Sequence, residues 1–371
     1  MDGPPIVLDN GTCLSKNGYG GEDQPRSVFN TLLGYPKYPN VMPEVNNIRE
    51  YYVGEEAMNI FDILSLCYPM KKGVIEDWEA MEKVWHYTFF KDLRLDSADH
   101  PVLLSERSGN PAPNRERAAE ILFETFNIPA LYISNQGTLS LYASGRTTGL
   151  IVDIGEGKTD IVPIYEGFAV TDAVRSFDIG GWDVTNRLQR LIRKSGYTSL
   201  TDLELVRDIK ERLCYVALDP EKDLKLVEKR SKIKRQYILP DHEIVALSSE
   251  RFLAPELFFD PAIIGRKEQS VDVEIYEAIV KCDIEHREEL LQNIVLAGGS
   301  TMLPGFEERL HQELTKWIPE GIEIRIVAPP ERLYLPWIGG SILSSLETFQ
   351  KMWITQKEYR EEGRSVVERC F

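Results

Sequence analysis

Short apolar runs alternate along the chain with longer stretches whose apolar residues recur at helical spacing. Helices are predicted at 136–144 and 201–218, and at 115–126, where Asn114 would be the N-cap after a Gly/Pro/Asn-rich turn. The apolar runs are typical of buried strands and lie at 6–8, 102–104, 132–134, 151–152 and 294–297. This alternation predicts an α/β protein with largely buried sheets.

Two stretches share one plan, in which an apolar strand ends in an aspartate and a Gly/Thr turn follows. Residues 6–12 contain Asp9, and residues 151–159 contain Asp153. The glycines let backbone N–H groups approach an anion, and an aspartate at a strand end can reach a metal ion or its waters. One such turn alone is more often a plain hairpin. Two matched copies favour a nucleotide held between two similar halves.

A third turn, at 294–301, has an apolar strand that ends in Gly298-Gly299 and is followed by Ser300 and Thr301. Glycines and hydroxyl groups at the start of a helix suit a phosphate or a nucleoside. The first repeat is expected to end near Thr148. The charged segment 220–235 is interpreted as a solvated surface excursion.

Composition limits the functional classes. With 371 residues, of which 43% are hydrophobic and 27% charged, the chain can form two domains without a disordered bias. A formal net charge of −16, with no Lys/Arg-dense segment, argues against nucleic-acid binding. No apolar stretch or signal-peptide pattern indicates membrane insertion or export. The scattered cysteines favour reduced thiols in a cytoplasmic or nuclear protein, rather than disulfides or a zinc site: Cys13, Cys67, Cys214, Cys282 and Cys370.

Several long stretches resemble actin and the actin-related proteins, namely 139–149, 162–167, 213–218, 328–332, 337–343 and the terminal 369–371. The resemblance extends over the whole chain. It implies an actin-like ATPase fold of two related α/β domains, each with a subdomain, that hold ATP or ADP and a divalent cation (Mg²⁺ or Ca²⁺) in the cleft between them. The implied domains are 1–148, with 339–371 packing back on it and the loop 38–52 in its small subdomain, and 149–338, with a small subdomain at about 182–260.

The resemblance assigns roles residue by residue. Asp9 and Asp153 would face the cation through water, and Gln136 would position the water that attacks the phosphate; these three are the expected catalytic residues. Glu211 resembles the glutamate that binds ribose. The positions expected to contact the nucleotide are Gly11, Thr12, Cys13, Leu14, Lys16, Gly155, Glu156, Gly157, Lys158, Thr159, Gly181, Arg207, Lys210, Glu211, Gly298, Gly299, Ser300, Met302, Leu303 and Leu333. Surface roles for the charged members, in particular Lys16, are the alternative.

Five positions depart from the pattern around the nucleotide. Cys13 replaces a glycine and Glu156 an aspartate, and Asp160 replaces a histidine associated with hydrolysis. An added carboxylate beside the phosphate predicts slow or absent ATP hydrolysis. Leu303 and Leu333 stand where actins usually have tyrosine and lysine, which weakens the expected contact with adenine.

Other departures concern partner surfaces. The loop 38–52 aligns with a segment that inserts into a neighbouring subunit, with Val41, Met42, Val45 and Ile48 as anchors, while 263–269 resembles the cross-strand plug but carries three charged residues. Asp2 alone replaces an acidic cluster, so myosin binding by that route is not expected. An apolar cleft for regulatory helices keeps Tyr142, Thr147, Ile342, Leu343, Leu346 and Met352, although several of these could be core residues.

Two functional hypotheses remain. The first is an ATP-binding cytoskeletal protein of the cytoplasm that assembles into filaments and hydrolyses ATP slowly. The second is an actin-related structural or regulatory subunit that does not hydrolyse ATP, and a nuclear location is compatible with it. Sugar kinases and seventy-kilodalton heat-shock chaperones share the repeat plan but not the long stretches above.

Overall fold

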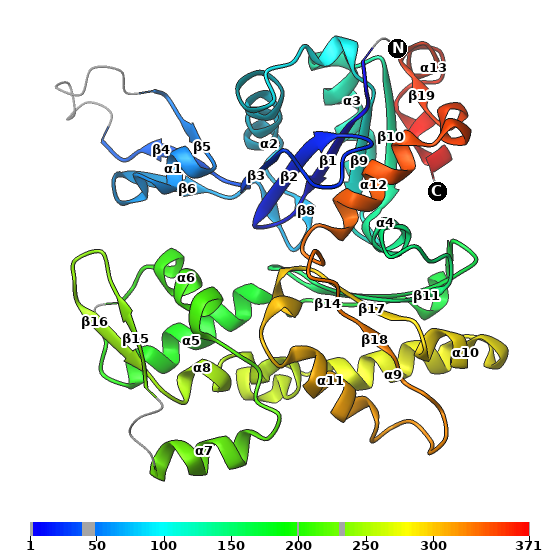
Figure 1. Ribbon diagram of the computed structural model, residues 1–371. Helices are drawn as coiled ribbons and strands as arrows, with labels where there is room; N and C mark the ends of the chain where they lie inside the picture. The colour runs from blue at the N-terminus through cyan, green and yellow to red at the C-terminus, as the bar shows by residue number, and fades with distance from the viewer. Residues whose placement is uncertain (1–2, 39–48, 199, 230–233, 371) are drawn as a thin grey trace. The chain divides into compact units, whose positions relative to one another are not determined.

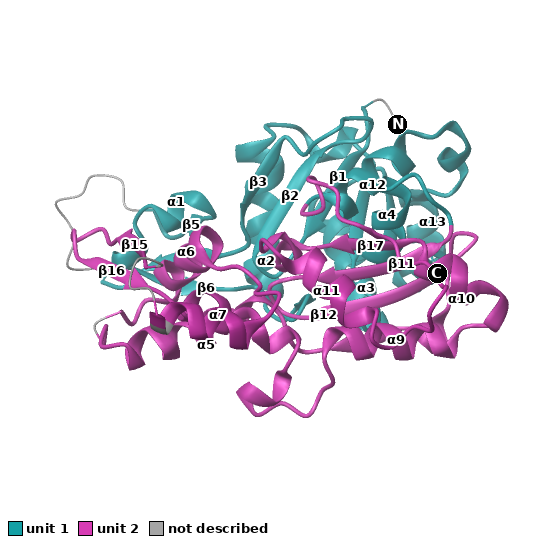
Figure 2. Ribbon diagram, turned by 60° about the horizontal axis from the view of Figure 1, so that its bottom comes forward, with its two compact units in different colours: residues 1–147, 334–371 teal, residues 148–333 magenta. Residues whose placement is uncertain are grey.

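The computed structural model describes residues 3–38, 49–198, 200–229 and 234–370. The chain divides into two compact units, coloured separately in Figure 2. Unit 1 contains Met1–Thr147 and Tyr334–Phe371, and unit 2 contains Thr148–Leu333.

Unit 1 is built on a six-stranded mixed sheet of order β19-β10-β9-β1-β2-β3. Strands β1, β9 and β10 are parallel, while β2, β3 and β19 pair antiparallel with their neighbours. The predicted apolar runs of this unit are therefore confirmed as its central strands. The strand bounds are β1 Ile6–Asn10, β2 Leu14–Tyr19, β3 Ser27–Asn30, β9 Val102–Glu106, β10 Ala130–Asn135 and β19 Ile354–Thr355.

The pleat of this sheet distributes alternate side chains to two hydrophobic cores. Ile6 and Leu8 pack into one core with residues of α2 (Trp78–His86) and α3 (Ala112–Glu120). Val7, which lies between them in β1, packs into the other core with residues of α4 (Gln136–Ala143) and α12 (Leu335–Ser345). Both faces are therefore covered, and the runs are apolar throughout rather than alternating (Figure 1).

Unit 2 repeats this plan. Strand β11 pairs antiparallel with β12 across a tight turn and parallel with β17, just as β1 pairs with β2 and β9. The full order is β13-β12-β11-β17-β18, with β14 also paired to β12. The bounds are β11 Gly149–Ile154, β12 Thr159–Tyr165, β13 Phe168–Ala169, β14 Arg175–Phe177, β17 Ile294–Ala297 and β18 Ile326–Val327.

The core of unit 2 joins β11 to the long helix α5 (Gly181–Lys194). Val184, Leu188 and Ile192 recur every four residues on one face of α5 and are completely buried. The other principal helices are α6 Leu203–Leu213, α9 Val271–Lys281, α10 Ile284–Leu291 and α11 Phe306–Leu314.

Smaller elements complete both units. In unit 1 they are α1 Glu55–Met58, α13 Gln356–Glu362 and the strands β4 Leu33–Pro36, β5 Tyr52–Val53, β6 Leu64–Cys67, β7 Met70–Lys71 and β8 Val74–Ile75. In unit 2 they are α7 Pro220–Lys229, α8 Glu250–Leu253, β15 Arg235–Ile238 and β16 Ile244–Leu247. No helix among the described residues is both long and apolar enough to cross a bilayer.

Two helix predictions need correction. Asn114 is not an N-cap, because α3 begins at Ala112 with Pro111 before it, and the Asn114 amide instead donates to Asn110. A proline at the start of a helix lacks only an N–H that the helix does not use, so it can begin the helix earlier. The helix predicted at 201–218 is shorter, since α6 ends at Leu213 and Cys214 has an extended backbone.

Candidate functional site

In unit 1, the turn between β1 and β2 is closed by a hydrogen bond of 2.9 Å from the Gly11 N–H to the Leu14 carbonyl. A Cβ on Gly11 would lie 3.0 Å from that carbonyl oxygen, so a small residue is needed there. The Thr12 hydroxyl accepts a hydrogen bond of 2.8 Å from the Gly73 N–H, and the Cys13 carbonyl accepts one from Thr31. The four predicted nucleotide contacts at 11–14 thus lie on one turn that is held at several points.

Asp9 lies just before this turn and is completely buried. Three donors surround its carboxylate: Lys16 Nζ at 2.8 Å, Ser105 Oγ at 2.5 Å and Gln136 Nε2 at 2.9 Å. Lys16 lies directly opposite Asp9 on β2, Ser105 lies near the end of β9, and Gln136 is the first residue of α4. The structure therefore brings together Asp9, Lys16 and Gln136, three of the residues expected at the site, and adds Ser105.

Sequence reasoning missed Ser105 although its signal was present. It follows the predicted strand 102–104, and the carboxyl ends of adjacent parallel strands lie at the same edge of a sheet. A serine at that position is within reach of an aspartate at the end of β1, because Leu8 and Leu104 are paired in the parallel register.

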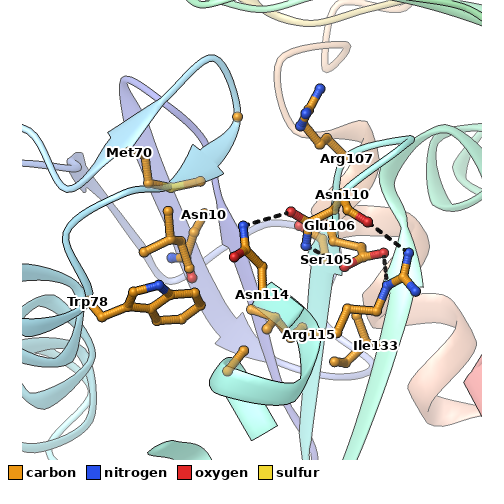
Figure 3. A pocket seen from close by; sticks show the side chains of 14 residues that line it. Asn10, Met70, Trp78, Ser105, Glu106, Arg107, Asn110, Asn114, Arg115 and Ile133 are labelled. Carbon is orange, nitrogen blue, oxygen red and sulfur yellow. Dashed lines mark hydrogen bonds and ion pairs between the residues drawn. The ribbon is translucent and has the colours of Figure 1, made fainter. Parts of the chain in front are cut away.

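A small cavity of about 30 Å³, lined by both polar and apolar side chains, adjoins the same strand ends in unit 1. Its lining side chains are drawn in Figure 3. Asn10, Asn114 and Glu106 contribute to its lining. Glu106 is held by Arg115 at 2.6 Å and Asn110 at 2.8 Å, while its burial raises the pKa of its carboxyl. The cavity has room for about one or two water molecules and is too small for a nucleotide.

In unit 2, the turn between β11 and β12 closes in the same way, with a hydrogen bond of 3.0 Å from the Gly155 N–H to the Lys158 carbonyl. Asp153 precedes this turn as Asp9 precedes the first one. Gly298, in the third turn, approaches Asp153 so closely that a Cβ would lie 2.3 Å from the Asp153 Oδ1, and its φ of +83° also favours glycine. Two of the three sequence-predicted turns therefore meet within unit 2.

Glu156 is the centre of a second set of contacts in unit 2. Lys210 of α6 lies 3.0 Å from Glu156 Oε2 and also donates to the Gly181 carbonyl at 3.1 Å. Ser300 Oγ donates to the Gly155 carbonyl at 2.9 Å, and a Cβ on Gly181 would lie 2.3 Å from Glu156 Oε2. The other oxygen of Glu156, Oε1, is buried and accepts no hydrogen bond from the described protein atoms.

The remaining predicted contacts of unit 2 differ in exposure. Glu211 is exposed at the end of α6, and the partial burial of its carboxyl nevertheless raises its pKa, an effect that Lys210 and Arg207 oppose. Leu303 is buried in the hydrophobic core of the unit, whereas Met302 is exposed. A Cβ on Gly299 would lie 3.3 Å from Leu333 Cδ1. Arg207 forms an ion pair with Glu204. Thr159 is buried, and its hydroxyl donates to the Ile179 carbonyl. Gly157 is half-buried.

Asp160 does not stand alone in the structure. Its carboxylate lies 2.7 Å from Lys158 Nζ, and both side chains are largely buried. The Lys158 ammonium also contacts Ser176 of β14. The negative charge that we expected Asp160 to add is therefore matched by a neighbouring cation, which the linear sequence did not indicate.

The predicted partner surfaces can be placed only in part. Val41, Met42, Val45 and Ile48 lie outside the described residues, as does Asp2. Ile263 and Ile264, the apolar tip of the predicted plug, pack against the core of unit 2, and Arg266 lies 3.9 Å from Asp183. In unit 1, Ile342, Leu346 and Met352 are exposed, Thr147 is exposed, Tyr142 is half-buried, and Leu343 packs partly into the core.

No group of three or more His, Cys, Asp or Glu side chains suited to a metal ion occurs within the described ranges. Cations such as Mg²⁺ often bind through one or two carboxylates together with water and phosphate oxygens.

Comparison with known protein families shows a match to the family described as Actin, which extends over residues 2–371. The matched region covers nearly the whole chain and both units. The topology described above, with two related α/β units that each carry an aspartate before a glycine turn, agrees with an actin-like α/β fold. The chain belongs to the actin family.

Proposed function

We propose that this protein is a cytoskeletal, nucleotide-binding actin-like protein that assembles into filaments and hydrolyses ATP slowly. One observation supports this most strongly. Each unit carries the same β-turn-β unit, in which a glycine N–H closes the turn, at 2.9 Å in unit 1 and 3.0 Å in unit 2, and an aspartate precedes it. Such turns present backbone N–H groups to an anion and carboxylates to a cation.

The residues fit a nucleotide with a divalent cation. Backbone N–H groups of 12–14 and 156–158 would hold phosphate oxygens, since those of Gly11 and Gly155 close the turns, and Lys16 would add positive charge in unit 1. In unit 2, the Glu156 carboxylate is held by Lys210, and Gly181 packs against the same turn, which keeps the shape of the proposed phosphate-binding turn. Asp9 and Asp153 would hold Mg²⁺ or Ca²⁺ through water, and the bound cation would neutralise charge on the phosphates.

Gln136 is proposed to orient the water that attacks the terminal phosphate. Its Nε2 donates a hydrogen bond to the Asp9 carboxylate. Because a carboxylate only accepts hydrogen bonds, this contact places the amide nitrogen toward Asp9 and the amide oxygen away from it. The Oε1 atom then remains an acceptor that can bind a water O–H. Positioning of this kind is the main task in phosphoryl transfer to water.

Its partners are proposed to be further copies of the chain and proteins that dock an apolar helix on the exposed side chains Ile342, Leu346 and Met352 of unit 1. A cytoplasmic, cytoskeletal location accompanies this proposal. A motor that requires an acidic N-terminal cluster is not expected to bind.

One observation favours the second hypothesis, a nucleotide-binding subunit that does not hydrolyse ATP. Asp160 stands where the family pattern has a histidine associated with hydrolysis, and its carboxylate is occupied by Lys158. A histidine ring can both donate and accept a hydrogen bond, so an aspartate paired with a lysine does not reproduce its hydrogen-bonding capacity.

High-speed sedimentation with ATP, Mg²⁺ and moderate salt tests the proposal, with phosphate release assayed in the same tubes. Pelleting above a critical concentration together with slow phosphate release would support the filament-forming ATPase. Pelleting without release would support assembly but not hydrolysis. A soluble, nucleotide-bound monomer would contradict assembly by the chain alone and favour the specialised subunit, while a protein that retains no nucleotide would contradict both hypotheses.

A further inference from the structure

The two related turns differ in the charge that lies opposite their aspartate. In unit 1, Asp9 pairs across the sheet with Lys16, and the two side chains form an ion pair of 2.8 Å. In unit 2, the residue directly opposite Asp153 is Asp160. The lysine of the first repeat is thus replaced by a second carboxylate in the equivalent place.

Two carboxylates directly opposite each other on antiparallel strands are unfavourable, because their Cβ atoms lie only about 4.5–5.5 Å apart. The repulsion increases in a partly buried setting, where water screens it less. The side chain of Asp160 is 13% exposed, so this setting applies.

Lys158 supplies the missing cation from two residues earlier in the chain. Its Nζ lies 2.7 Å from Asp160 Oδ1, and its side chain is only 8% exposed. It also contacts the hydroxyl of Ser176, which is the partner of Asp160 on β14. The ammonium group is therefore directed onto the sheet, between β12 and β14, rather than toward solvent.

Glu156 also forms an ion pair with a lysine, since Lys210 Nζ lies 3.0 Å from Glu156 Oε2. The carboxylates of Glu156 and Asp160 each have an ammonium partner within unit 2. Without Lys158, the strands that carry the proposed phosphate-binding turn would have an additional buried negative charge.

We infer that Lys158 is a positioning residue that neutralises Asp160 and thereby keeps the β11–β12 turn able to hold a polyphosphate. This inference rests on the proposed function. It departs from the direct nucleotide contact that the sequence predicted for Lys158, because the side chain acts through Asp160.

The test measures equilibrium binding of two probes to the full chain, a fluorescent etheno-ATP with Mg²⁺ and uncharged adenosine. Lys158→Met removes the charge while keeping a long side chain, and should weaken ATP binding by about tenfold with less than about a twofold effect on adenosine. Lys158→Arg should restore ATP binding to within about threefold of the wild type, because it keeps the charge. Adding Asp160→Asn to Lys158→Met should recover most of the lost affinity, because it removes the unpaired carboxylate.

Asp160→Asn alone provides a test if Lys158→Met does not fold. It removes one negative charge from beside the turn, so ATP should bind more tightly by about twofold or more while adenosine binding changes little. Arg309→Met is the control, because it breaks another largely buried ion pair of unit 2, between α11 and Glu256. It should lower the stability of the fold and change the affinities for etheno-ATP and adenosine by the same factor.

Three results would overturn the inference. Lys158→Met could weaken the binding of adenosine as much as that of etheno-ATP, which would indicate a purely structural role. The double variant could bind ATP no better than Lys158→Met, or Asp160→Asn could fail to strengthen ATP binding. A wild-type protein that binds neither probe would instead contradict the proposed function itself, and the inference with it.

Discussion

The side-chain amide of Gln136 donates a hydrogen bond of 2.9 Å to the carboxylate of Asp9. The same carboxylate also accepts hydrogen bonds from Lys16 and Ser105. Asp9 is thus held by side chains from β2, β9 and α4 of unit 1. This arrangement couples the residue proposed to orient water to one of the two residues proposed to face the cation. A change at either position should therefore affect both functions, although not equally.

Gln136→Ala should reduce the rate of phosphate release by about tenfold to about a hundredfold if the protein hydrolyses ATP, since loss of a positioning group has effects of this size. Nucleotide retention should change less, because Lys16 and Ser105 still hold Asp9. Single-turnover phosphate release and etheno-ATP dissociation measure the two effects separately. Gln189→Ala is the control, because Gln189 lies on α5, in the unit that does not contain Asp9, and donates to the Thr201 carbonyl. An unchanged hydrolysis rate in Gln136→Ala would remove Gln136 from this role.

Asp153→Ala should lower nucleotide retention in the presence of Mg²⁺ and reduce its dependence on the cation. The carboxylate lies at the end of β11, just before the turn closed by Gly155. Its removal takes away one of the two oxygen groups proposed to bind the hydrated ion. The measurement is the dissociation rate of etheno-ATP with and without a chelator. Asp172→Ala changes an exposed aspartate of the same unit and should leave this rate as it is. Retention that remained equally cation-dependent in Asp153→Ala would exclude it from the metal site.

The sequence predicted the central strands and the glycine turns because those features are local. An apolar run such as 6–8 is stable only as a strand that is buried on both faces. A glycine turn directly after such a run can be recognised from the adjacent residues alone. Both sheets contain the predicted runs at their centres. The repeated plan also became visible in the linear sequence, since each aspartate stands at the same distance from its turn.

Cross-strand pairing was not predictable in the same way. The sequence indicated that Asp160 adds a charge near the phosphates, but only the register shows that it lies opposite Asp153 and that Lys158 reaches it. The burial of Leu303 is a similar case, because it follows from packing against residues distant in the chain. The start of α3 was misplaced for a different reason, since Asn114 and Pro111 are both acceptable at a helix start and the local pattern did not decide between them.

Gly298→Ala should destabilise unit 2 and weaken nucleotide retention. The backbone at Gly298 has φ of 83° and ψ of 153°, a region that only glycine occupies readily, and a Cβ would lie 2.3 Å from Asp153 Oδ1. Gly363→Ala is a matched control, because Gly363 has φ of 81° and ψ of −173° but no atom within 4 Å of its Cβ position. Backbone strain of about 1–3 kcal/mol is common to both variants. A Cβ on Gly298 would also lie 2.5 Å from the Ile154 carbonyl oxygen. Denaturant unfolding should therefore show a larger loss in Gly298→Ala, and an equal loss would mean that Asp153 and the Ile154 backbone move away at no cost.

The start of α13 gives a pH-dependent prediction that does not involve a ligand. Glu358 accepts hydrogen bonds from the N–H and hydroxyl of Thr355 and pairs with Arg369 at 2.9 Å. These contacts, the Thr355 backbone first, lower the pKa of Glu358 from 4.5 to about 2. Because the charged form is favoured in the folded state, its contribution is present above the ordinary pKa and is lost as the pH falls toward about 2.

Glu358→Gln keeps an oxygen that can accept from the Thr355 N–H but removes the charge, so it should reduce the free energy of unfolding at neutral pH by about 0.3–1 kcal/mol, a typical value for a charge at a helix start. The difference between wild type and variant should shrink between about pH 5 and about pH 2, as the wild-type carboxylate becomes protonated. Denaturant unfolding across that range measures it, provided that the folded state persists at the lowest pH. Glu361→Gln is the control, since Glu361 lies on the same helix and is 64% exposed, with Lys357 3.8 Å away, so its difference from wild type should be small throughout. A constant difference between wild type and Glu358→Gln over this pH range would mean that the ionised carboxylate is not what stabilises the helix start.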